Sequence, residues 1–330
     1  MSVTIYDIAA EAEVSIATVS RVLNGSPRVA KATRARVHRV AERMGYQPHA
    51  LAQSLARQTT GLVSAVIPVL TNDFYMEVLR GIQDAVAQSD FDLLVYAASD
   101  PEHVDGQLAR ALQRGRAEGV LLLSTPVDAA RRELLNGSTV VLLDVADAAF
   151  DSFTVDNSLG GYLATHHLLE NGFQRIAHIS VVPEPLPARE RRAGYERALA
   201  EAGRTPLIAA SDQRPYGFSE AAGYEAMTAL LALPERPDAV FIASDAQALG
   251  ALSALREAGL SAPHDMAVVG FDDIKVAEVV GLSTVRQPMH EMGRLAVERL
   301  VARLADSQAP PIQHVFSPTL VVRASSARRV

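Results

Sequence analysis

Short polar side chains and one arginine gather in the stretch VSIATVSRVLNGS, residues 14–26. With Ser15 as the N-cap of a helix, the valines and the leucine share one side, and Ser20 and Arg21 fall on the other. A helix of this size with hydrogen-bonding side chains on its free face fits the major groove of B-form DNA. The stretch therefore predicts a DNA-recognition helix, and the alternative is the solvated face of a small helical bundle.

A second group of chemistry-bearing side chains follows the ends of apolar runs that are predicted to be strands. In a parallel sheet covered by helices, ligands bind where the carboxyl ends of the strands meet. The residues at these ends are Asn72, Asp73, Phe74 and Tyr75 after the first run, Ser124 after the third, and Asp144 and Asp147 after the fourth. They predict a small-molecule site, although Phe74 and Tyr75 alternatively fill the core.

The predicted recognition helix needs neighbours to cover its apolar side. Thr4 is placed to cap a preceding helix, whose apolar residues recur at the spacing of a buried stripe. These residues are Ile5, Ile8, Ala9 and Ala12. A third helix is expected at residues 31–44, with Gly45 at its C-terminal end. Its inward residues are Val37, Val40, Ala41 and Met44. Together these segments predict a three-helix head with a helix-turn-helix.

A short segment, HALAQSLAR at residues 49–57, follows Pro48. It has helical propensity, but peptide helices below roughly 12 residues are marginal in water. It is therefore expected to fold when DNA and a second chain support it, with Leu55 as an apolar wedge in the minor groove. The alternative is an ordinary linker.

Beyond Gly61 the sequence alternates apolar runs with amphipathic segments, which is typical of parallel sheets with helices on both faces. The predicted strands are residues 62–68, 92–98, 119–124, 139–144, 175–180, 238–244 and 266–273. The predicted helices are residues 75–88, 104–114, 129–135, 159–170, 188–202, 219–233 and 246–258. SFTVDN, residues 152–157, is predicted to be a turn between two such sets. The pattern predicts an α/β fold with two doubly wound lobes behind the small all-α head.

Charge is divided unevenly along the 330 residues, whose formal net charge is -7. Residues 1–60 carry eight Lys and Arg against four Asp and Glu, and the remainder carries 23 against 34. A polyanion is therefore attracted to the head and repelled by the body. The length of 330 residues predicts two or three packed units, and the apolar content of 48% argues against disorder. No apolar run approaches the roughly 18 residues that cross a bilayer. With no cysteine and no export signal, the chain is expected in the cytoplasm.

Enzyme signatures are missing from the sequence. It has no GxGxxG after a strand, no GxxxxGK[ST] and no GxSxG. His166 and His167 are adjacent on a predicted helix and point in different directions, unlike a metal pair at i and i+4. Asp272 and Asp273 have no converging pattern of histidine or glutamate. We therefore expect no catalytic residues, no cofactor and no metal site.

Residues 3–63 resemble the head of the LacI/GalR family of bacterial transcription regulators. The resemblance includes the VTxxDIA start, the VSxxTVSRVLN recognition helix and the GYxPxxxAxSL hinge, and further patterns extend to about Leu320. It implies that Ile16, Ala17 and Arg21 contact base edges, and that Leu55 intercalates. Further DNA-binding positions implied by the resemblance are Thr4, Tyr6, Ser15, Thr18, Ser20, Asn24, Arg28 and Ala52.

Three positions depart from the family pattern. Glu13 stands in the turn where Gly, Asn or Lys is usual, which predicts a slightly strained turn and a carboxylate near the phosphates. His49 replaces the common asparagine of the hinge. Ile16 and Ala17 offer no hydrogen-bond donor, so Arg21, apolar contact and DNA shape must supply the specificity.

The body resembles periplasmic sugar-binding proteins and the family's effector domain, in which the chain crosses between two lobes. The implied crossings lie near Ser158, Gln287 and Ser317. The predicted domains are a head at 1–48, a hinge helix and linker at 49–60, and an effector-binding and dimerisation domain at 61–330. Lobe 1 is assigned about 61–157 and 288–317, and lobe 2 about 158–287 and 318–330.

The resemblance implies an effector site in the cleft between these lobes. Its implied residues are Asn72, Asp73, Phe74, Tyr75, Ser124, Asp147, Arg191, Phe218, Ser244, Asp272 and Gln287. Arg191 alternatively lies on the surface, Asp272 alternatively caps a helix, and Asp245 is assigned to capping. Carboxylate, guanidinium and aromatic groups together suit a polyhydroxylated ligand, so a sugar or sugar derivative is expected.

Three hypotheses for the function follow. The favoured one is a homodimeric regulator, a repressor, that binds near-palindromic double-stranded operator DNA and is switched by the effector. The second is a solute-binding protein for sugars without a DNA function, against which the basic head argues. The third is an enzyme on a doubly wound fold, against which the missing motifs argue.

Overall fold

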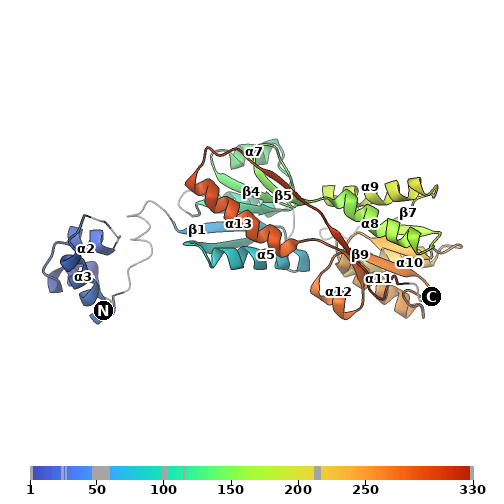
Figure 1. Cartoon of the computed structure of the whole chain (residues 1–330), viewed down its shortest axis with the longest axis horizontal. Helices are drawn as coiled ribbons and strands as arrows, with labels where there is room; N and C mark the ends of the chain where they lie inside the picture. The colour runs from blue at the N-terminus through green and yellow to red at the C-terminus, as the bar shows by residue number, and fades with distance from the viewer. Residues whose placement is uncertain are drawn as a thin grey trace. The chain divides into compact units, whose positions relative to one another are not determined.

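The computed structural model describes residues 3–23, 26, 28–46, 60–98, 103–113, 116–211 and 217–327. The chain separates into two compact units, a small one of residues 1–62 with 114–118 and a large one of the remaining residues. Each unit is described by itself, and Figure 1 identifies their elements. The predicted hinge at 49–60 lies outside the described residues except for Thr60.

Three helices form the head, α1 at Ile5–Glu11, α2 at Ile16–Leu23 and α3 at Lys31–Arg43. Thr4 and Asp7 form a reciprocal capping box at the start of α1, in which the Thr4 N–H donates to Asp7 Oδ2 over 2.8 Å. The helices enclose one small core, made of Ile8, Ala9, Ala12, Val19, Val22, Val37, Val40 and Ala41. The structure thus confirms the predicted three-helix head and its inward faces.

The turn between α1 and α2 passes through a left-handed residue. Glu13 has a φ of 50°. This conformation costs a non-glycine residue on the order of 1 kcal/mol, because its Cβ crowds the following carbonyl oxygen. The predicted strain at this turn is therefore confirmed.

The large unit contains two six-stranded sheets, of which the first has the order β11-β5-β4-β3-β1-β2. Its strands are β1 at Leu62–Ile67, β2 at Asp92–Ala97, β3 at Gly119–Leu123, β4 at Thr139–Leu143, β5 at Asp151–Val155 and β11 at Gln313–Phe316. Apolar residues fill β3 and β4 almost without interruption, because helices cover both faces of the sheet. On one face lie α5 (Asp73–Val86) and α13 (Met289–Ala305), and on the other α6 (Val104–Ala111) and α7 (Ala129–Leu135).

The second sheet has the order β12-β10-β9-β8-β6-β7. Its strands are β6 at Ile176–Val181, β7 at Leu207–Ser211, β8 at Ala239–Ile242, β9 at Ala267–Asp272, β10 at Ser283–Arg286 and β12 at Thr319–Val321. One face is covered by α8 (Asn157–Glu170) and α9 (Leu186–Glu201), and the other by α10 (Glu220–Leu231), α11 (Asp245–Glu257) and α12 (Lys275–Val279). Only the edge strand β12 pairs antiparallel among the registered pairs of this described sheet. Two doubly wound α/β lobes are therefore confirmed.

One element of the body was predicted wrongly, and some strands, among them β7, were not predicted. Residues 152–157 were expected to be a turn, but most of them belong to β5, which pairs with β4 on one side and β11 on the other. One of the two partners that make this segment a strand, β11, comes from a distant part of the sequence. The strand β7 was not predicted, because its sequence LIAAS is short, lies at a sheet edge and has no long apolar run.

The chain passes between the two sheets at three places, which lie between β5 and α8, between β10 and α13, and between β11 and β12. Ser158, Gln287 and Ser317 lie in or beside these segments. The domain limits drawn from them stay predictions. These crossings place polar residues from both lobes near the same strand ends.

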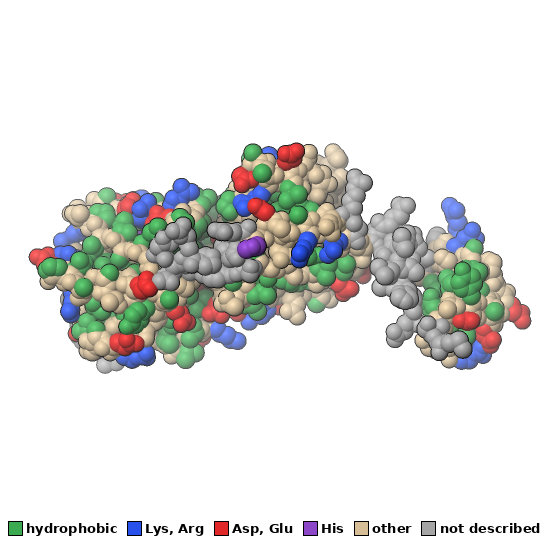
Figure 2. Space-filling view, turned by 180° about the vertical axis from the view of Figure 1, so that it is seen from behind, with side chains coloured by type: hydrophobic (Ala, Val, Ile, Leu, Met, Phe, Trp, Pro, Cys, Tyr) green, Lys and Arg blue, Asp and Glu red, His purple; other side chains and the backbone are tan. Residues whose placement is uncertain are grey.

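The surface of the large unit is mixed in charge. On the face in Figure 2, acidic and basic side chains lie among one another, so the acidic excess of the body is dispersed there. Among the helices that the structure describes, none is long and apolar enough to cross a membrane.

Helices α8 and α9 approach each other backbone to backbone. A Cβ on Gly161 of α8 would lie 2.0 Å from the carbonyl oxygen of Arg191 on α9. A Cβ on Gly194 of α9 would lie 2.0 Å from the carbonyl oxygen of Ser158. Two facing glycines therefore permit this contact, which fixes the backbone of Arg191 against α8.

We expect Gly161→Ala to destabilise the large unit by about 1–3 kcal/mol, because the added methyl group forces the two helices apart. Urea denaturation of the full-length protein measures this change. Gly106→Ala is the matched control, since Gly106 lies within α6 and an added Cβ there meets nothing within 4 Å. Alanine at Gly106 should stabilise its helix by up to about 1 kcal/mol. Equal effects of the two substitutions would show that α8 and α9 do not need the close contact.

Candidate DNA-binding surface and effector site

The outer face of α2 carries the residues that are predicted to contact base edges. Ile16 is 43% exposed, and Ala17 and Arg21 are also exposed. Val19 and Val22 on the opposite side are buried in the head. The helical period thus separates a packing side from a free face with one long cationic side chain.

The hydroxyl groups around α2 take part in local caps. The Thr18 N–H donates to Ser15 Oγ over 3.2 Å, and the two hydroxyl oxygens lie 2.9 Å apart. Thr4 is held in the capping box, whereas Tyr6 and Arg28 are exposed. Ser20 is half-buried. The remaining predicted DNA contacts, Asn24, Ala52 and Leu55, lie outside the described residues.

Tyr75, Ser124 and Asp144 come together where β3 and β4 end and α5 begins. Ser124 Oγ donates to Asp144 Oδ2 over 2.7 Å, while Asp144 Oδ1 is buried without a hydrogen-bond partner. Burial, and then the negative charge of Asp144, raises the pKa of the Tyr75 phenol, which also interacts with Ser124. Burial likewise raises the pKa of Asp144, against the hydrogen bond from Ser124. This side of the site therefore offers a buried carboxylate oxygen that is ready to accept a hydrogen bond.

Arg191, Asp272 and Gln287 come together in the second lobe. Gln287 Nε2 donates to Asp272 Oδ1 over 2.6 Å, and Arg191 NH1 lies 3.8 Å from the same oxygen. Arg191 is 5% exposed, and its guanidinium carbon lies 3.8 Å from the centroid of the Phe271 ring. Burial raises the pKa of Asp272 to about 6, although the charge of Arg191 opposes this shift. Arg191 is therefore a buried residue of the site and not a surface arginine.

Electrostatic interactions join these two groups across the lobes. Beyond the effect of burial, the charge of Asp144 raises the pKa of Asp272, and the charge of Asp272 raises that of Tyr75. Such interactions require the two groups to lie close together, although they follow strands of different sheets. We call this cluster the interlobe site, and its members described so far are Tyr75, Ser124, Asp144, Arg191, Asp272 and Gln287.

Backbone strain coincides with the interlobe site. Ser124, Asp144 and Asp272 have φ angles of 46°, 63° and 120°, and they follow or end β3, β4 and β9. Left-handed conformations of non-glycine residues cost on the order of 1–3 kcal/mol each and concentrate at binding sites. The strain thus points to the same strand ends as the polar contacts.

Several predicted effector residues have structural partners instead. Asn72 caps α5, with the Phe74 N–H donating to its Oδ1 over 2.9 Å, and Phe74 lies in the core of the first lobe. Ser244 caps α11. Asp147 forms an ion pair with Arg132 on α7. The structure therefore does not show these four side chains among the contacts of the interlobe site.

Phe218 stays near the site, because the Arg191 guanidinium carbon lies 5.8 Å from its ring centroid. Asp73 is exposed at the start of α5. The capping role assigned to Asp245 was wrong, since α11 begins at Asp245 itself and leaves Ser244 in the cap position. The buried Asp245 carboxylate instead accepts hydrogen bonds from the Ile274 N–H and the Thr284 hydroxyl, over 3.0 and 2.7 Å.

Sequence analysis missed two polar residues of the interlobe site. Asn157 Oδ1 accepts a hydrogen bond from Arg191 Nε over 2.9 Å, and Asn157 Nδ2 donates to Glu190 Oε2 over 3.2 Å. Asn157 follows β5, so the rule of strand ends finds it once β5 is known to be a strand. Glu190 lies in the charged run ARERR, where nothing distinguishes it from a surface glutamate.

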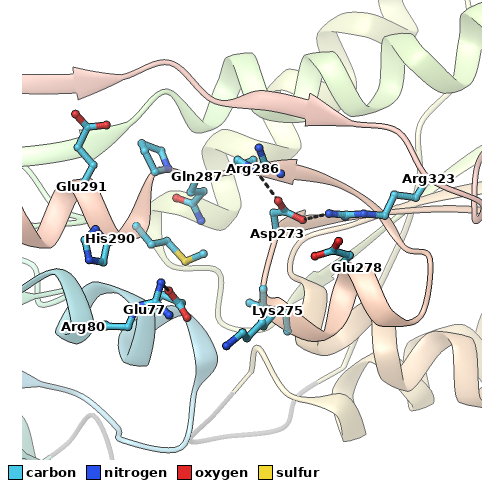
Figure 3. Close-up of a pocket in the computed structure, with 13 residues that line it drawn as sticks. Glu77, Arg80, Asp273, Lys275, Glu278, Arg286, Gln287, His290, Glu291 and Arg323 are labelled. Atoms are coloured by element: carbon cyan, nitrogen blue, oxygen red, sulfur yellow. Dashed lines mark hydrogen bonds and ion pairs between the residues drawn. The ribbon is translucent and has the colours of Figure 1, made fainter.

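A second hollow, of about 420 Å³, lies beside this site and is shown in Figure 3. Asp273 lies at its side, with Arg286 Nε at 2.6 Å and Arg323 NH2 at 2.8 Å from its carboxylate oxygens. The other charged residues that line it are Glu77, Arg80, Lys275, Glu278 and Glu291. Gln287 is the one predicted effector residue in its lining. We call it the outer pocket, and its mixed charges favour no ion of one sign.

These features define a class of protein. A helix-turn-helix head with an exposed recognition face, followed by a bilobal α/β body with a buried polar site, is the architecture of a ligand-regulated DNA-binding protein.

Residues 4–49 match the family described as bacterial regulatory proteins, lacI family, and residues 165–326 match the periplasmic binding protein-like domain. The ribose operon repressor of Escherichia coli (strain K12) is 35% identical over 98% of this chain and 99% of that protein. The chain belongs to the lacI family of bacterial regulatory proteins.

Solved structures of other regulators are similar to this chain. A lac repressor dimer bound to operator and the anti-inducer ONPF matches with a TM-score of 0.86 and 26% identity, over 99% of this chain and 100% of that one. The complex of the transcriptional regulator CelR with cellobiose matches with a TM-score of 0.70 and 33% identity, over 98% and 99%. The similarity therefore covers both the head and the body.

Proposed function

We propose that the protein is a transcriptional repressor that binds operator DNA through its head and is switched by a sugar-like effector. The observation that carries this proposal is the exposed face of α2, which presents Arg21 from a basic three-helix head. A solute-binding protein without a DNA function has no role for such a face. The relatives support the proposal, since they include a ribose operon repressor and a lac repressor bound to its operator.

In this proposal Ile16, Ala17 and Arg21 contact base edges, and Leu55 intercalates in the minor groove. The residues proposed to steady the DNA backbone or the hinge are Thr4, Tyr6, Ser15, Thr18, Ser20, Asn24, Arg28 and Ala52. Two heads of a homodimer would contact two half-sites, because a two-fold symmetric protein requires a near-palindromic operator. The dimeric lac repressor on its operator supports this assembly.

The effector is proposed to bind in the interlobe site. Solved relatives with bound cellobiose and bound ribose support a sugar. The residues proposed to contact it are Tyr75, Ser124, Asp144, Asn157, Glu190, Arg191, Phe218, Asp272 and Gln287. Closure of the lobes around the effector changes the separation of the two hinge segments, which couples effector to DNA by roughly 1–3 kcal/mol.

Arg21→Ala is expected to weaken binding to a specific operator by about 10- to 100-fold, because a bidentate contact of arginine with guanine contributes roughly 1–3 kcal/mol of discrimination. A duplex enriched from a random pool by the full-length protein is compared with a shuffled duplex in a mobility-shift assay. Binding to the shuffled duplex should change far less, since it depends mainly on phosphate contacts.

Arg39→Ala supplies the matched control, because Arg39 is exposed on α3 and has no predicted base contact. It should affect both duplexes equally. If the wild-type protein binds no duplex at low salt, the repressor function is excluded. If Arg21→Ala weakens both duplexes equally, α2 does not recognise bases.

A further inference from the structure

We propose that the interlobe site selects uncharged or amino-substituted polyols and excludes sugar phosphates and sugar acids. This inference rests on the proposed function, in which that site holds the effector. It comes from the charges around Arg191, since the negative charges of Asp272, Asp144, Asp245 and Glu190 all act on its guanidinium.

The three carboxylates are close enough to act on one another and on Arg191. Arg191 lies 3.8 Å from Asp272, and the charges of Asp144 and Glu190 also act on it. Burial raises the pKa of the Asp144 carboxyl group, and the negative charge of Glu190 raises it further. With Asp245 included, four carboxyl groups act on this one guanidinium, so negative charge outweighs positive charge here wherever at least two of them are ionised. A further anion is therefore repelled, and the low local dielectric strengthens that repulsion.

Arg191 offsets this excess only in part for an incoming anion, because two of its five N–H donors are already engaged. Its Nε donates to Asn157 Oδ1 over 2.9 Å, and NH1 donates to the Ala243 carbonyl over 2.6 Å. The Phe271 ring lies 3.8 Å from the guanidinium carbon and covers one face of the group. The fork geometry that binds a phosphate needs two parallel free N–H groups on adjacent nitrogens, and two of the three nitrogens here are in use.

Two buried acceptors in the site have no donor. Asp144 Oδ1 and Gln287 Oε1 are buried without hydrogen-bond partners, and Gln287 is only 3% exposed. A ligand that brings hydroxyl or ammonium groups supplies the missing hydrogens. An ionised phosphate or carboxylate group offers mainly acceptors, so it cannot take the place of a hydroxyl or ammonium group opposite either oxygen. Charge and hydrogen bonding therefore both disfavour an anionic group beside these two oxygens.

Matched sugars test this inference on the full-length protein. D-Ribose is compared with D-ribose 5-phosphate, and D-glucose and D-glucosamine are compared with D-glucuronate, D-glucose 1-phosphate and D-glucose 6-phosphate, with cellobiose as a further neutral probe. Thermal shift at pH 8 finds the sugars that bind, and calorimetry gives their Kd. We expect a neutral or amino-substituted member of at least one series to bind at least tenfold more tightly than its anionic counterparts.

Glu190→Gln removes one charge without changing the shape of the side chain. It should reduce the preference against the anionic member by at least threefold. Glu196→Gln is the control on the same helix, since Glu196 is exposed and pairs with Arg192 over 3.8 Å. The control should leave the preference unchanged. If Glu190→Gln does not fold, Asp144→Asn removes another carboxylate of the site. It should likewise reduce the preference for neutral or amino-substituted sugars over anionic ones.

Anionic members that bind as tightly as the neutral ones would overturn the inference, as would a panel in which no member binds. Equal effects of Glu190→Gln and Glu196→Gln would overturn the assignment to these carboxylates. The mobility shift with the enriched duplex needs no sugar and is run beside these measurements. If the protein binds DNA but does not prefer neutral or amino-substituted sugars over anionic ones, this inference alone is refuted. If the protein binds no DNA, the proposed function is refuted.

Discussion

Replacing Asp272 with asparagine is expected to stabilise the effector-free protein by about 3 kcal/mol at pH 7 and to abolish its response to an effector. The stabilisation arises because burial raises the pKa of Asp272 from 3.8 to about 6, so that an ionised carboxylate is held there at a cost. Asparagine keeps the shape and still accepts the hydrogen bond from Gln287. The response is lost because the amide does not replace a carboxylate that accepts hydrogen bonds from ligand hydroxyls.

The direction of the pH effect follows from this raised pKa. The Asp272 carboxyl ionises near 3.8 in the unfolded chain and near 6 in the folded protein. The folded state therefore binds the proton more tightly, and the stability that Asp272 contributes is present below 3.8 and lost as the pH rises through 6. The variant cannot ionise at this position, so its advantage should be largest near pH 7 and should decrease towards pH 4.5.

Urea denaturation of wild type and variant between pH 4.5 and 7.5 measures this difference. Asp147→Asn is the control, because the hydrogen bond from Arg132 lowers the pKa of Asp147 and its removal should not stabilise the protein. A constant difference across the pH range would show that Asp272 acts through packing and not through its charge.

The second large effect is expected at Asp151, where Asp151→Ala should destabilise the protein by about 3–5 kcal/mol. Asp151 is 1% exposed at the start of β5. It accepts hydrogen bonds from Arg299 Nε over 2.7 Å and from the Ile312 N–H over 2.8 Å, and Arg303 Nε lies 3.3 Å away. Alanine leaves both arginines of α13 without this carboxylate and loosens the segment that leads into β11.

Urea denaturation at pH 7 checks this prediction, with Asp151→Asn as the intermediate case that keeps an acceptor but not the charge. Glu235→Ala breaks the exposed pair with Arg175 and should cost at most about 1 kcal/mol. If Asp151→Ala costs no more than Glu235→Ala, the buried ion pairs do not hold α13 to the sheet.

Much of the fold follows from local sequence patterns. The head was predictable because its apolar residues recur with the period of a helix and Thr4, Ser15 and Gly45 mark helix ends. The strands β3 and β4 were predictable because buried parallel strands are nearly continuous in Val and Leu. The strand β5 was missed because it depends on β4 and on β11, which follows it by more than 150 residues.

The candidate site was only partly predictable. The rule of strand ends led to Tyr75, Ser124 and Asp144, and the family resemblance led to Arg191 and Asp272. Neither the rule nor the resemblance gives the rotamer of a side chain or its contact partner. The predicted effector site therefore included Phe74, which lies in the core, and Asp147, which pairs with Arg132. Asn157 was missed because β5 was not predicted to be a strand, and Glu190 was missed because its charged neighbours in the sequence make it look like a surface glutamate.

The interleaved course of the chain has a consequence for its synthesis. The first sheet starts with β1 near residue 62, but it needs α13 and β11, which end at residue 316. The second sheet receives β12 only at residues 319–321. Neither lobe can acquire its full set of strands before the ribosome has translated past residue 316, so the lobes mature together and not one after the other.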